Sequence, residues 1–590
     1  MMTALARFSF RAMCSWGALL TMLLLVVASG CSGGSRDSGS KELPVAGADG
    51  RRSDTLPGSP ASSGATGAGG AVSGSVHAAP GPKTGDDVTR DDRGAEDNTD
   101  PAPADIDHGT NPDGGANGSH DSDTNPKPEP LFEGWPEPKL VLFLTGRQNG
   151  YIEPCGCTGL ANQKGGLSRR HTFYQQLVSR GWNVVPLDVG SQVRRFGRQP
   201  EIKFQFTADG LTRMKYQGVT LGSDDLRLSG LEMFSLLVNL HRESKSPFVG
   251  SNVTVLDPQV MPAYRVVTAG GKKIGITSVL GDEEQRRVNN GDVTLVPAEE
   301  GLKKAWDSLQ EEKCDFHVLL VHADLDATKK LAQAFPDFDV VVTAGGADEP
   351  AFRPETIPDS KAQLVQVGAK GMYVGVLGVF DDEKEPYRFQ RVPLDARFED
   401  SREMLDLLAA YQRQLEQAGL EGLGLKPIPH PSGHSFVGSE KCGECHTTAY
   451  GIWKETPHAH ATLSISEPTE RSDIPRHFDP ECLSCHVTGW NPQKYTPYSS
   501  GYLSLDKTPL MVGNGCENCH GPGSAHVAAE EGEAEASDRE ITALRAAMRL
   551  PLDRAEHHCM ECHDLDNSPD FHAAGAFEKY WKEIEHKGRY

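Results

Sequence analysis

The pentapeptide Cys-x-x-Cys-His occurs four times in the last quarter of the chain, and no other feature restricts its fold and chemistry as strongly. In this motif the two thiols form thioether bonds to the vinyl groups of a haem, and the adjacent histidine binds the iron. The sequence therefore predicts four covalently bound c-type haems, each with a proximal histidine. The four copies are Cys442-Gly-Glu-Cys445-His446, Cys482-Leu-Ser-Cys485-His486, Cys516-Glu-Asn-Cys519-His520 and Cys559-Met-Glu-Cys562-His563.

Structural zinc is the alternative partner for paired cysteines, because two Cys-x-x-Cys pairs can build one Cys₄ site. Such a site does not require a histidine after every second cysteine, and here a histidine follows all four times. The repeated histidine favours haem. Four haems attached within one short segment would form much of its core, so we expect this segment not to fold without them.

Several phrases around the motifs resemble the tetrahaem electron carriers of ammonia-oxidising bacteria and their multihaem reductase relatives, over about residues 434–588. These phrases are Trp453-Lys-Glu-Thr-Pro-His458-Ala-His460, Gly515-Cys-Glu-Asn-Cys-His-Gly-Pro-Gly-Ser-Ala-His526 and Tyr580-Trp-Lys-Glu-Ile-Glu-His586. The resemblance implies that His458 and His526 are distal haem ligands, with His586 as a further candidate. It also leaves room for one haem without a distal ligand, whose iron would be open to a small substrate. The weaker distal candidates, which are as compatible with surface positions, are His434, His460, His477, His558 and His572.

The first 31 residues predict export. Arg7 and Arg11 precede the apolar run 17–27, which is too short to span a bilayer. The following Ala28-Ser29-Gly30-Cys31 resembles a bacterial lipoprotein signal (residues 1–30), which implies acylation of Cys31, although the family usually has Leu where Ala28 stands. A plain secretory peptide is the alternative. Ser32 after the cysteine favours the outer membrane by analogy with the sorting pattern of lipoproteins.

Residues 31–135 have the composition of a disordered tether, rich in Gly, Ser, Pro and Asp. Residues 32–135 contain 18 acidic and 8 basic residues, a net −10 of the chain's −23. Much of the acidity therefore belongs to a solvated linker rather than to a binding face. The rest of the chain divides into residues 136–400, a helical linker 401–430 and the haem segment 431–590.

Apolar runs alternating with amphipathic stretches predict a layered α/β domain over residues 136–400, with functional loops at the strand ends. The haem segment should instead be mostly helical and rich in loops. The expected strands of the α/β domain are 139–144, 183–188, 218–222, 272–277, 316–322, 339–343 and 372–377, and the first expected helix is 168–180.

The order of short motifs in this domain resembles the metallophosphatase domain of periplasmic 5′-nucleotidases, over about residues 138–395. Examples are Gly165-Gly-Leu-Ser-Arg169, Leu187-Asp-Val-Gly190 and Val321-His322. That family holds two metal ions with Asp, His and Asn ligands, which activate a water for attack on phosphate.

Most ligand positions of that family carry other residues here. Arg147 and Asn149 replace the first Asp and His, Ser191 replaces the bridging Asp, and Gly345-Gly-Ala-Asp348 replaces Gly-His-x-His. Asn and His of a further motif have become Ser223 and Asp224, and only His322 stands where a ligand is expected. We therefore expect a degenerate domain without a dinuclear metal site, in which Asp188, Asp224 and Asp225 bind at most one hard cation weakly.

The first loop contains Glu153-Pro-Cys155-Gly-Cys157-Thr-Gly159, which leaves three alternatives. Cys155 and Cys157 form a strained, reducible disulfide, bind a metal or haem edge with His322, or are an inert structural pair. The loop resembles a nucleotidase-like family in which one of these cysteines can be selenocysteine, which implies a redox role. Arg147 and Lys164 could lower a thiol pKa there. Cys314 is expected to be a lone buried thiol.

Together these features predict an exported, lipid-anchored tetrahaem c-type cytochrome that transfers electrons and carries a non-hydrolytic 5′-nucleotidase-like domain. The alternatives are a haem- or Cys-based reductase of a small substrate (speculatively through Cys155 and Cys157), a phosphoesterase with unrecognised ligands, and a module that docks a redox partner. Expected partners are redox proteins or quinol-linked donors and a membrane, reached through Cys31, but not nucleic acid. The expected location is the cell envelope, facing the periplasm or the surface.

Overall fold

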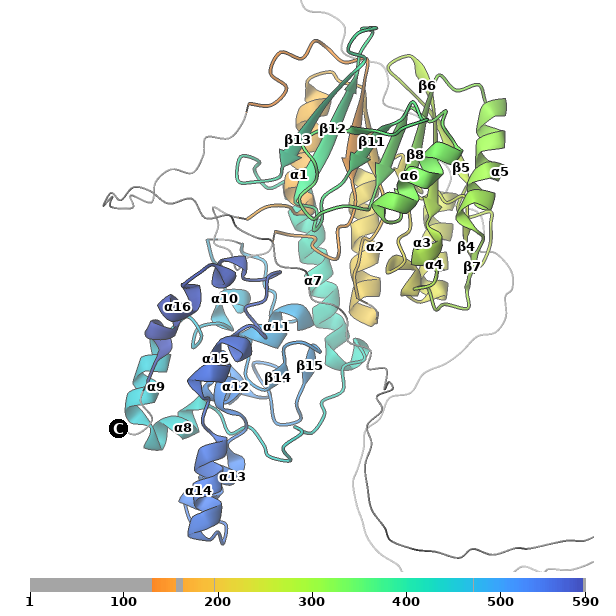
Figure 1. Ribbon diagram of the computed structural model, residues 1–590. Helices are drawn as coiled ribbons and strands as arrows, with labels where there is room; N and C mark the ends of the chain where they lie inside the picture. The colour runs from red at the N-terminus through yellow and green to blue at the C-terminus, as the bar shows by residue number, and fades with distance from the viewer. Residues whose placement is uncertain (1–129, 155–162, 196, 471, 587–590) are drawn as a thin grey trace, which may run out of the picture. The chain divides into compact units, whose positions relative to one another are not determined.

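Two β-sheets form the centre of the α/β domain in the computed structural model of Figure 1. The structure describes residues 130–154, 163–195, 197–470 and 472–586. The first sheet has the strand order β13-β12-β1-β2-β3, in which β1 pairs parallel with β2 and antiparallel with β12. Its strands are β1 Leu140–Thr145, β2 Val184–Asp188, β3 Gly218–Val219, β12 Tyr373–Val379 and β13 Tyr387–Pro393.

The second sheet has the order β10-β11-β9-β8-β6-β5, with a parallel centre and an antiparallel strand at each edge. A separate pair, β4 Val253–Val255 and β7 Val293–Leu295, lies outside both sheets. The strands of the second sheet are β5 Tyr264–Ala269, β6 Lys272–Leu280, β8 Phe316–His322, β9 Val340–Thr343, β10 Glu355–Thr356 and β11 Gln363–Gln366.

Strand β1 shows why these residues form buried strands. Successive side chains of a strand point to opposite faces, and every residue of β1 is buried. Leu142 and Leu144 pack with Leu320 of the second sheet, in a core between the two sheets. Val141 and Phe143 belong to a different core, on the side of the helices. Because β1 lies between these two cores, its side chains must be apolar on both faces.

Helices cover the outer faces of both sheets, so the domain has four layers (Figure 1). Helices α1, α2 and α7 contribute to the core on the first sheet, and α5 and α6 to the core on the second. This arrangement confirms the predicted layered α/β fold. The helices are α1 Leu167–Ser179, α2 Arg198–Arg213, α3 Gly230–Arg242, α4 Asp282–Gln285, α5 Ala298–Glu311, α6 Leu325–Ala334 and α7 Arg402–Gly422, with a 3₁₀ turn at Asp225–Arg227.

The described C-terminal part consists mostly of short helices and loops, as predicted, and it also contains a two-stranded ribbon that the sequence did not predict. Its apolar core is small, with Phe436, Trp490, Tyr498 and Tyr502 among its buried members. The elements are α8 Ser439–Cys445, α9 Thr447–Lys454, α10 Leu463–Ser466, α11 Pro480–His486, β14 Trp490–Asn491, β15 Thr496–Pro497, α12 Cys516–His520, α13 Ser524–Glu530, α14 Asp538–Ala547, α15 Leu552–Cys559 and α16 Ala576–Ile584, with 3₁₀ turns at Pro509–Met511 and Pro569–His572.

Helix α7 links the two parts, which belong to the same compact unit of the chain. Met404 and Leu407, near its start, pack into the core over the first sheet. Leu415, further along, packs in a cluster with Phe478 of the C-terminal part. Within the described ranges, no helix combines the length and hydrophobicity that crossing a bilayer requires.

Candidate functional site

Short helical turns carry the four Cys-x-x-Cys-His motifs. Residues three apart on a helix lie on the same face, so each turn presents both thiols to one side. In the first and fourth copies the backbone N–H of the histidine also donates to the backbone carbonyl of the first cysteine, at 2.9 Å in each case. All eight motif cysteines are free thiols, which is the state that forms thioethers with haem.

Three motif histidines each lie beside a histidine from elsewhere in the chain. The ring centroids of His446 and His526 are 6.3 Å apart, those of His563 and His458 are 6.0 Å apart, and those of His520 and His586 are 5.7 Å apart. Two imidazoles that bind one metal from opposite sides, each at roughly 2 Å, have ring centres roughly 6 Å apart. The three pairs therefore fit the axial ligands of three haems.

Hydrogen bonds at Nδ1 orient several of these imidazoles. A carbonyl can only accept, so Nδ1 of His520 donates to Met548 at 2.7 Å, and Nδ1 of His586 donates to Ile584 at 2.9 Å. Nδ1 of His486 likewise donates to the carbonyl of Ala461 at 2.8 Å. This arrangement fixes the tautomer in which Nε2 carries a lone pair for a metal.

Burial disfavours the charged form of three histidines in these pairs. It lowers the pKa of His563 to about 4, and it also lowers the pKa values of His458 and His520 below the usual range. A metal ligand must be an unprotonated imidazole, so a lowered pKa favours ligation at neutral pH. Together with the free thiols, these residues fit c-type haem.

Some weaker distal candidates have other roles in the structure. Nε2 of His558 lies 2.8 Å from the carbonyl of Asn518, and Nε2 of His572 lies 2.8 Å from the carbonyl of His563. Both nitrogens donate there and are not lone-pair ligands. The ring of His477 packs on Phe478, with 3.8 Å between centroids.

Contacts between cysteines of different motifs give the spatial order of the attachment sites. The side chains of Cys442 and Cys516 interact, as do those of Cys485 and Cys562. The thiol of Cys519 lies within electrostatic range of the fourth motif. The four sites therefore follow one another as first, third, fourth and second motif, an order that the sequence does not reveal.

A cavity of about 600 Å³ lies beside the second motif. Cys482, Cys485 and His486 line one side of it, and residues 150–154 of the α/β domain line another, with Lys203 of α2. Its volume is in the range of cofactor and ligand sites. Sequence reasoning missed these α/β residues, because nothing local marks Lys203 or residues 150–152 as part of a haem site.

At the strand ends of the α/β domain, the side chains that replace metal ligands bind one another. Arg147 pairs with Asp348, with 2.6 Å between Nη2 and Oδ1. Nδ1 of His322 donates to the carbonyl of Val189 at 2.7 Å, and burial lowers the pKa of His322. Ser223 donates to Glu284.

The two buried carboxylates of this region accept hydrogen bonds from the surrounding loops. Asp225 accepts from the backbone N–H groups of Ser191, Val193 and Gly222, at 2.9–3.1 Å. Asp188 accepts from Thr145 at 2.6 Å and from Gly190 and Gln192. Within the described ranges, no group of three or more His, Cys, Asp or Glu side chains is arranged to hold a metal ion.

The candidates Cys155, Cys157 and Cys31 lie outside the described residues. The two cations expected near the cysteine pair are described. Arg147 is engaged with Asp348, and the ammonium of Lys164 lies 5.7 Å from the ring centre of Tyr373. Cys314 is free and only partly buried, whereas the sequence favoured a buried thiol, because it stands at the solvent-exposed start of β8.

Comparisons with known proteins divide the chain in the same way. Residues 441–521 match the family model described as cytochrome c554 and c-prime. Cytochrome c-554 of Nitrosomonas europaea is 28% identical over 160 residues, which cover 26% of this chain and 68% of that protein.

The α/β domain is similar to a different group of proteins. An apyrase of Aedes albopictus is 26% identical over 298 residues, which cover 45% of this chain and 53% of the apyrase. The chain thus spans about half the length of the curated apyrases it matches. A solved 5′-nucleotidase precursor from Thermus thermophilus is 20% identical, with a TM-score of 0.41 and coverage of 47% of this chain and 59% of that one.

Proposed function

We propose that this cytochrome c, which is fused to a 5′-nucleotidase-like domain, transfers electrons through four covalently bound haems. The observation that carries the proposal is the pairing of three motif histidines with His458, His526 and His586 at centroid distances of 5.7–6.3 Å. Two imidazoles on one iron give a low-spin centre suited to electron transfer.

Haem supplies the one-electron chemistry, and the protein holds and tunes it. Cys442, Cys482, Cys516 and Cys559, with their partners three residues on, hold the four groups. The adjacent histidines would bind the iron, and hydrogen bonds to carbonyls fix the ring orientations of His486 and His520. Since the attachment sites follow one another in space, haems held there would let electrons pass from one to the next.

The α/β domain is non-hydrolytic in this proposal. Its strand-end side chains are used for ion pairs and backbone hydrogen bonds, as for Arg147 with Asp348 and for Asp225. A two-metal mechanism needs several carboxylates and imidazoles that converge on one point. Similarity to apyrases favours a second candidate, a phosphoesterase, and phosphate release from nucleotides tests it.

The protein is exported and held at the cell envelope through an acylated Cys31, most favourably in the outer membrane. Its partners there are redox proteins or quinol-linked donors. The signal-like residues 1–30 and the long polar segment after them support this location.

A redox-titrated visible spectrum of the matured protein tests the main proposal. We expect c-type absorption bands that change in several one-electron steps, with mostly low-spin iron. A matured protein without covalent haem would overturn the proposal. Turnover of a small substrate at one of the haems would instead favour a reductase.

A further inference from the structure

The helix that carries the second motif begins inside a polar network built largely by the α/β domain. Asp479 is the N-cap of α11 and accepts from the N–H of Glu481 at 2.9 Å. Its carboxylate also accepts from Gln199 of α2 at 2.6 Å and from Gln412 of α7 at 3.2 Å. Tyr411 of α7 lies in the same network. The α/β domain and α7 therefore fix the start of the helix that holds Cys482 and Cys485.

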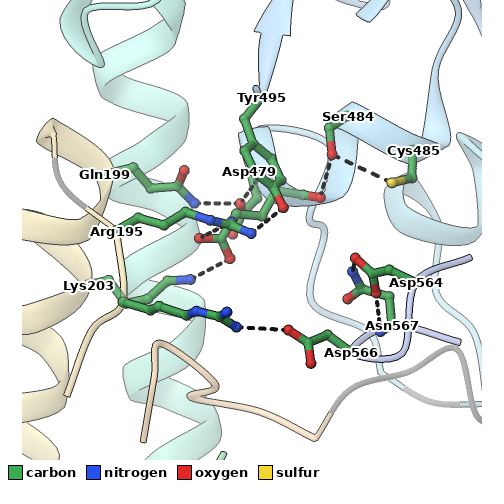
Figure 2. A network of polar contacts seen from close by, with 12 residues as sticks. Arg195, Gln199, Lys203, Asp479, Ser484, Cys485, Tyr495, Asp564, Asp566 and Asn567 are labelled. Atoms are coloured by element: carbon green, nitrogen blue, oxygen red, sulfur yellow. Dashed lines mark hydrogen bonds and ion pairs between the residues drawn. The ribbon is translucent and has the colours of Figure 1, made fainter. Parts of the chain in front are cut away.

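Figure 2 shows ion pairs that join the same two parts of the chain. Lys203 of α2 donates to Glu481 at 2.7 Å, and Arg195 pairs with the other oxygen of Glu481 at 3.2 Å. Burial opposes the charge of Lys203, but Glu481 and Asp479 outweigh it and raise the pKa of the ammonium. Lys203 therefore carries a buried positive charge at neutral pH.

A second pair lies across the same cavity. Arg476, which is 6% exposed, binds both oxygens of Glu153 in a fork, at 2.7 and 2.5 Å. Glu153 belongs to the first loop of the α/β domain, and Arg476 precedes α11 by a few residues. A bidentate pair of this kind fixes geometry as well as charge.

Both pairs line the cavity that contains Cys482, Cys485 and His486. A haem attached to these cysteines would lie near Lys203 and Glu153, because the two side chains line the same cavity. Carboxylates outnumber cations in the lining: they are Glu153, Glu470, Asp479, Glu481, Glu561 and Asp564.

We propose that the α/β domain forms the second wall of the binding site for the haem attached to Cys482 and Cys485, and that Lys203 and Glu153 tune the reduction potential of this haem in opposite directions. The inference rests on the proposed haem attachment. It gives the 5′-nucleotidase-like domain a role that needs no hydrolysis.

The signs follow from electrostatics. Oxidation adds one positive charge to the haem, and a neighbouring cation disfavours that charge, whereas a carboxylate favours it. Loss of the Lys203 charge should make the potential more negative, and loss of the Glu153 charge should make it more positive. Lys203 is buried and Glu153 is partly buried, so solvent and salt screen their effect less than that of charges at the exposed surface.

The experiment is a spectroelectrochemical titration of full-length, matured Lys203→Met and Glu153→Gln variants. Each should shift one of the four midpoint potentials, downward for Lys203→Met and upward for Glu153→Gln, and leave the other three close to wild type. Lys203→Arg should restore the wild-type potential. Lys304→Met and Glu300→Gln make the same charge changes on α5, where both side chains are exposed, and should shift none.

In each variant, the side chain that loses its ion-pair partner keeps another contact. Glu481 keeps Arg195, and Arg476 keeps its hydrogen bond to the carbonyl of Ile474. Circular dichroism and haem content per chain establish that each variant is folded and loaded.

Four haems in each variant with unchanged potentials, or shifts of the same sign in both, would overturn the inference while leaving electron transfer intact. A wild-type protein that carries no haem would overturn the proposed function instead. Shifts spread equally over all four haems would also contradict a site limited to Cys482 and Cys485.

Discussion

The imidazole of His446 faces that of His526, with 6.3 Å between the ring centroids and an interplanar angle of 27°. His446 ends the first haem motif, and His526 lies on α13, shortly after the third motif. The two residues approach each other because α8, α12 and α13 pack together, through buried contacts such as Glu517 with the N–H groups of Val437 and Gly438.

This pairing predicts the effect of a ligand change. Replacing His526 with Met should leave four haems attached but raise one midpoint potential, because a thioether ligand favours reduced iron. Electron paramagnetic resonance and a redox titration provide the measurement. His241→Met is the matched control, since His241 is exposed in the last turn of α3 and is not a ligand candidate. An unchanged spectrum for His526→Met would remove His526 from the ligand set.

Haem stoichiometry is the second prediction. Protein matured with a cytochrome c assembly system should have the mass of the chain plus four haems, and denaturation should not release them. The Cys442→Ala/Cys445→Ala variant should lose one haem and be less stable, because haems form part of the core. Cys314→Ala should keep all four. Intact mass spectrometry distinguishes these outcomes, and a variant that still carries four would contradict the assignment.

The third prediction concerns hydrolysis. Metal-dependent release of phosphate from nucleotides should be absent, because Arg147 and Ser191 occupy positions that a two-metal site requires for ligands. Phosphate release with added divalent ions, measured beside an active apyrase, provides the assay. Turnover that His322→Ala abolishes would show that the domain is catalytic.

The fourth prediction follows from the buried Asp225, whose pKa burial raises to about 7. Below about pH 4 the carboxyl is protonated in both folded and unfolded chains. Between about pH 4 and 7 only the unfolded chain loses the proton, so this group lowers stability as pH rises, by up to roughly 1.4 kcal/mol per pH unit. Above pH 7 its contribution is constant.

Thermal unfolding of wild type and Asp225→Asn across this pH range measures the effect. The difference in Tm between them should vary with pH in the stated sense. The variant should also be less stable, because one amide oxygen cannot accept from three backbone N–H groups, and an unsatisfied buried donor costs about 1–3 kcal/mol. Asp224→Asn is the control. A pH-independent difference would mean that Asp225 is ionised throughout.

The fifth prediction is that Cys155 and Cys157 form a redox pair. Oxidation of the two thiols to a disulfide releases two electrons and two protons, and the haems would exchange those electrons one at a time. Maleimide labelling of both thiols should therefore increase when the haems are reduced with dithionite. The Cys155→Ser/Cys157→Ser variant gives the background labelling. Labelling of wild type that does not depend on haem reduction would show that the pair has a structural role only.

Local sequence patterns predicted the elements of the α/β domain closely. The apolar run 316–322 is strand β8 over the same residues, and the helix expected at 168–180 is α1 Leu167–Ser179. The strand is buried on both faces and the helix is amphipathic, so the pattern of apolar residues predicts both elements. The short strand β3 ends at Val219 rather than residue 222, because the chain turns there towards Asp225.

Contacts between distant segments could not be predicted in this way. Lys203 and Glu481 are 278 residues apart, and each taken alone resembles an ordinary surface charge. Their pairing depends on how α2, α7 and α11 pack, which no local period encodes. The same holds for the pair His520 and His586. The sequence around His586 indicated only a possible distal ligand and did not identify His520 as its partner.

The capping of α11 by Asp479 has a consequence for biogenesis. The partners of Asp479 come from α2 and α7, which are synthesised before it, and in the docked α11 Cys482 and Cys485 are only partly exposed. We therefore expect haem to reach Cys482 and Cys485 more readily before these helices close around Asp479. In that order of events, maturation of the second motif precedes final docking of the α/β domain.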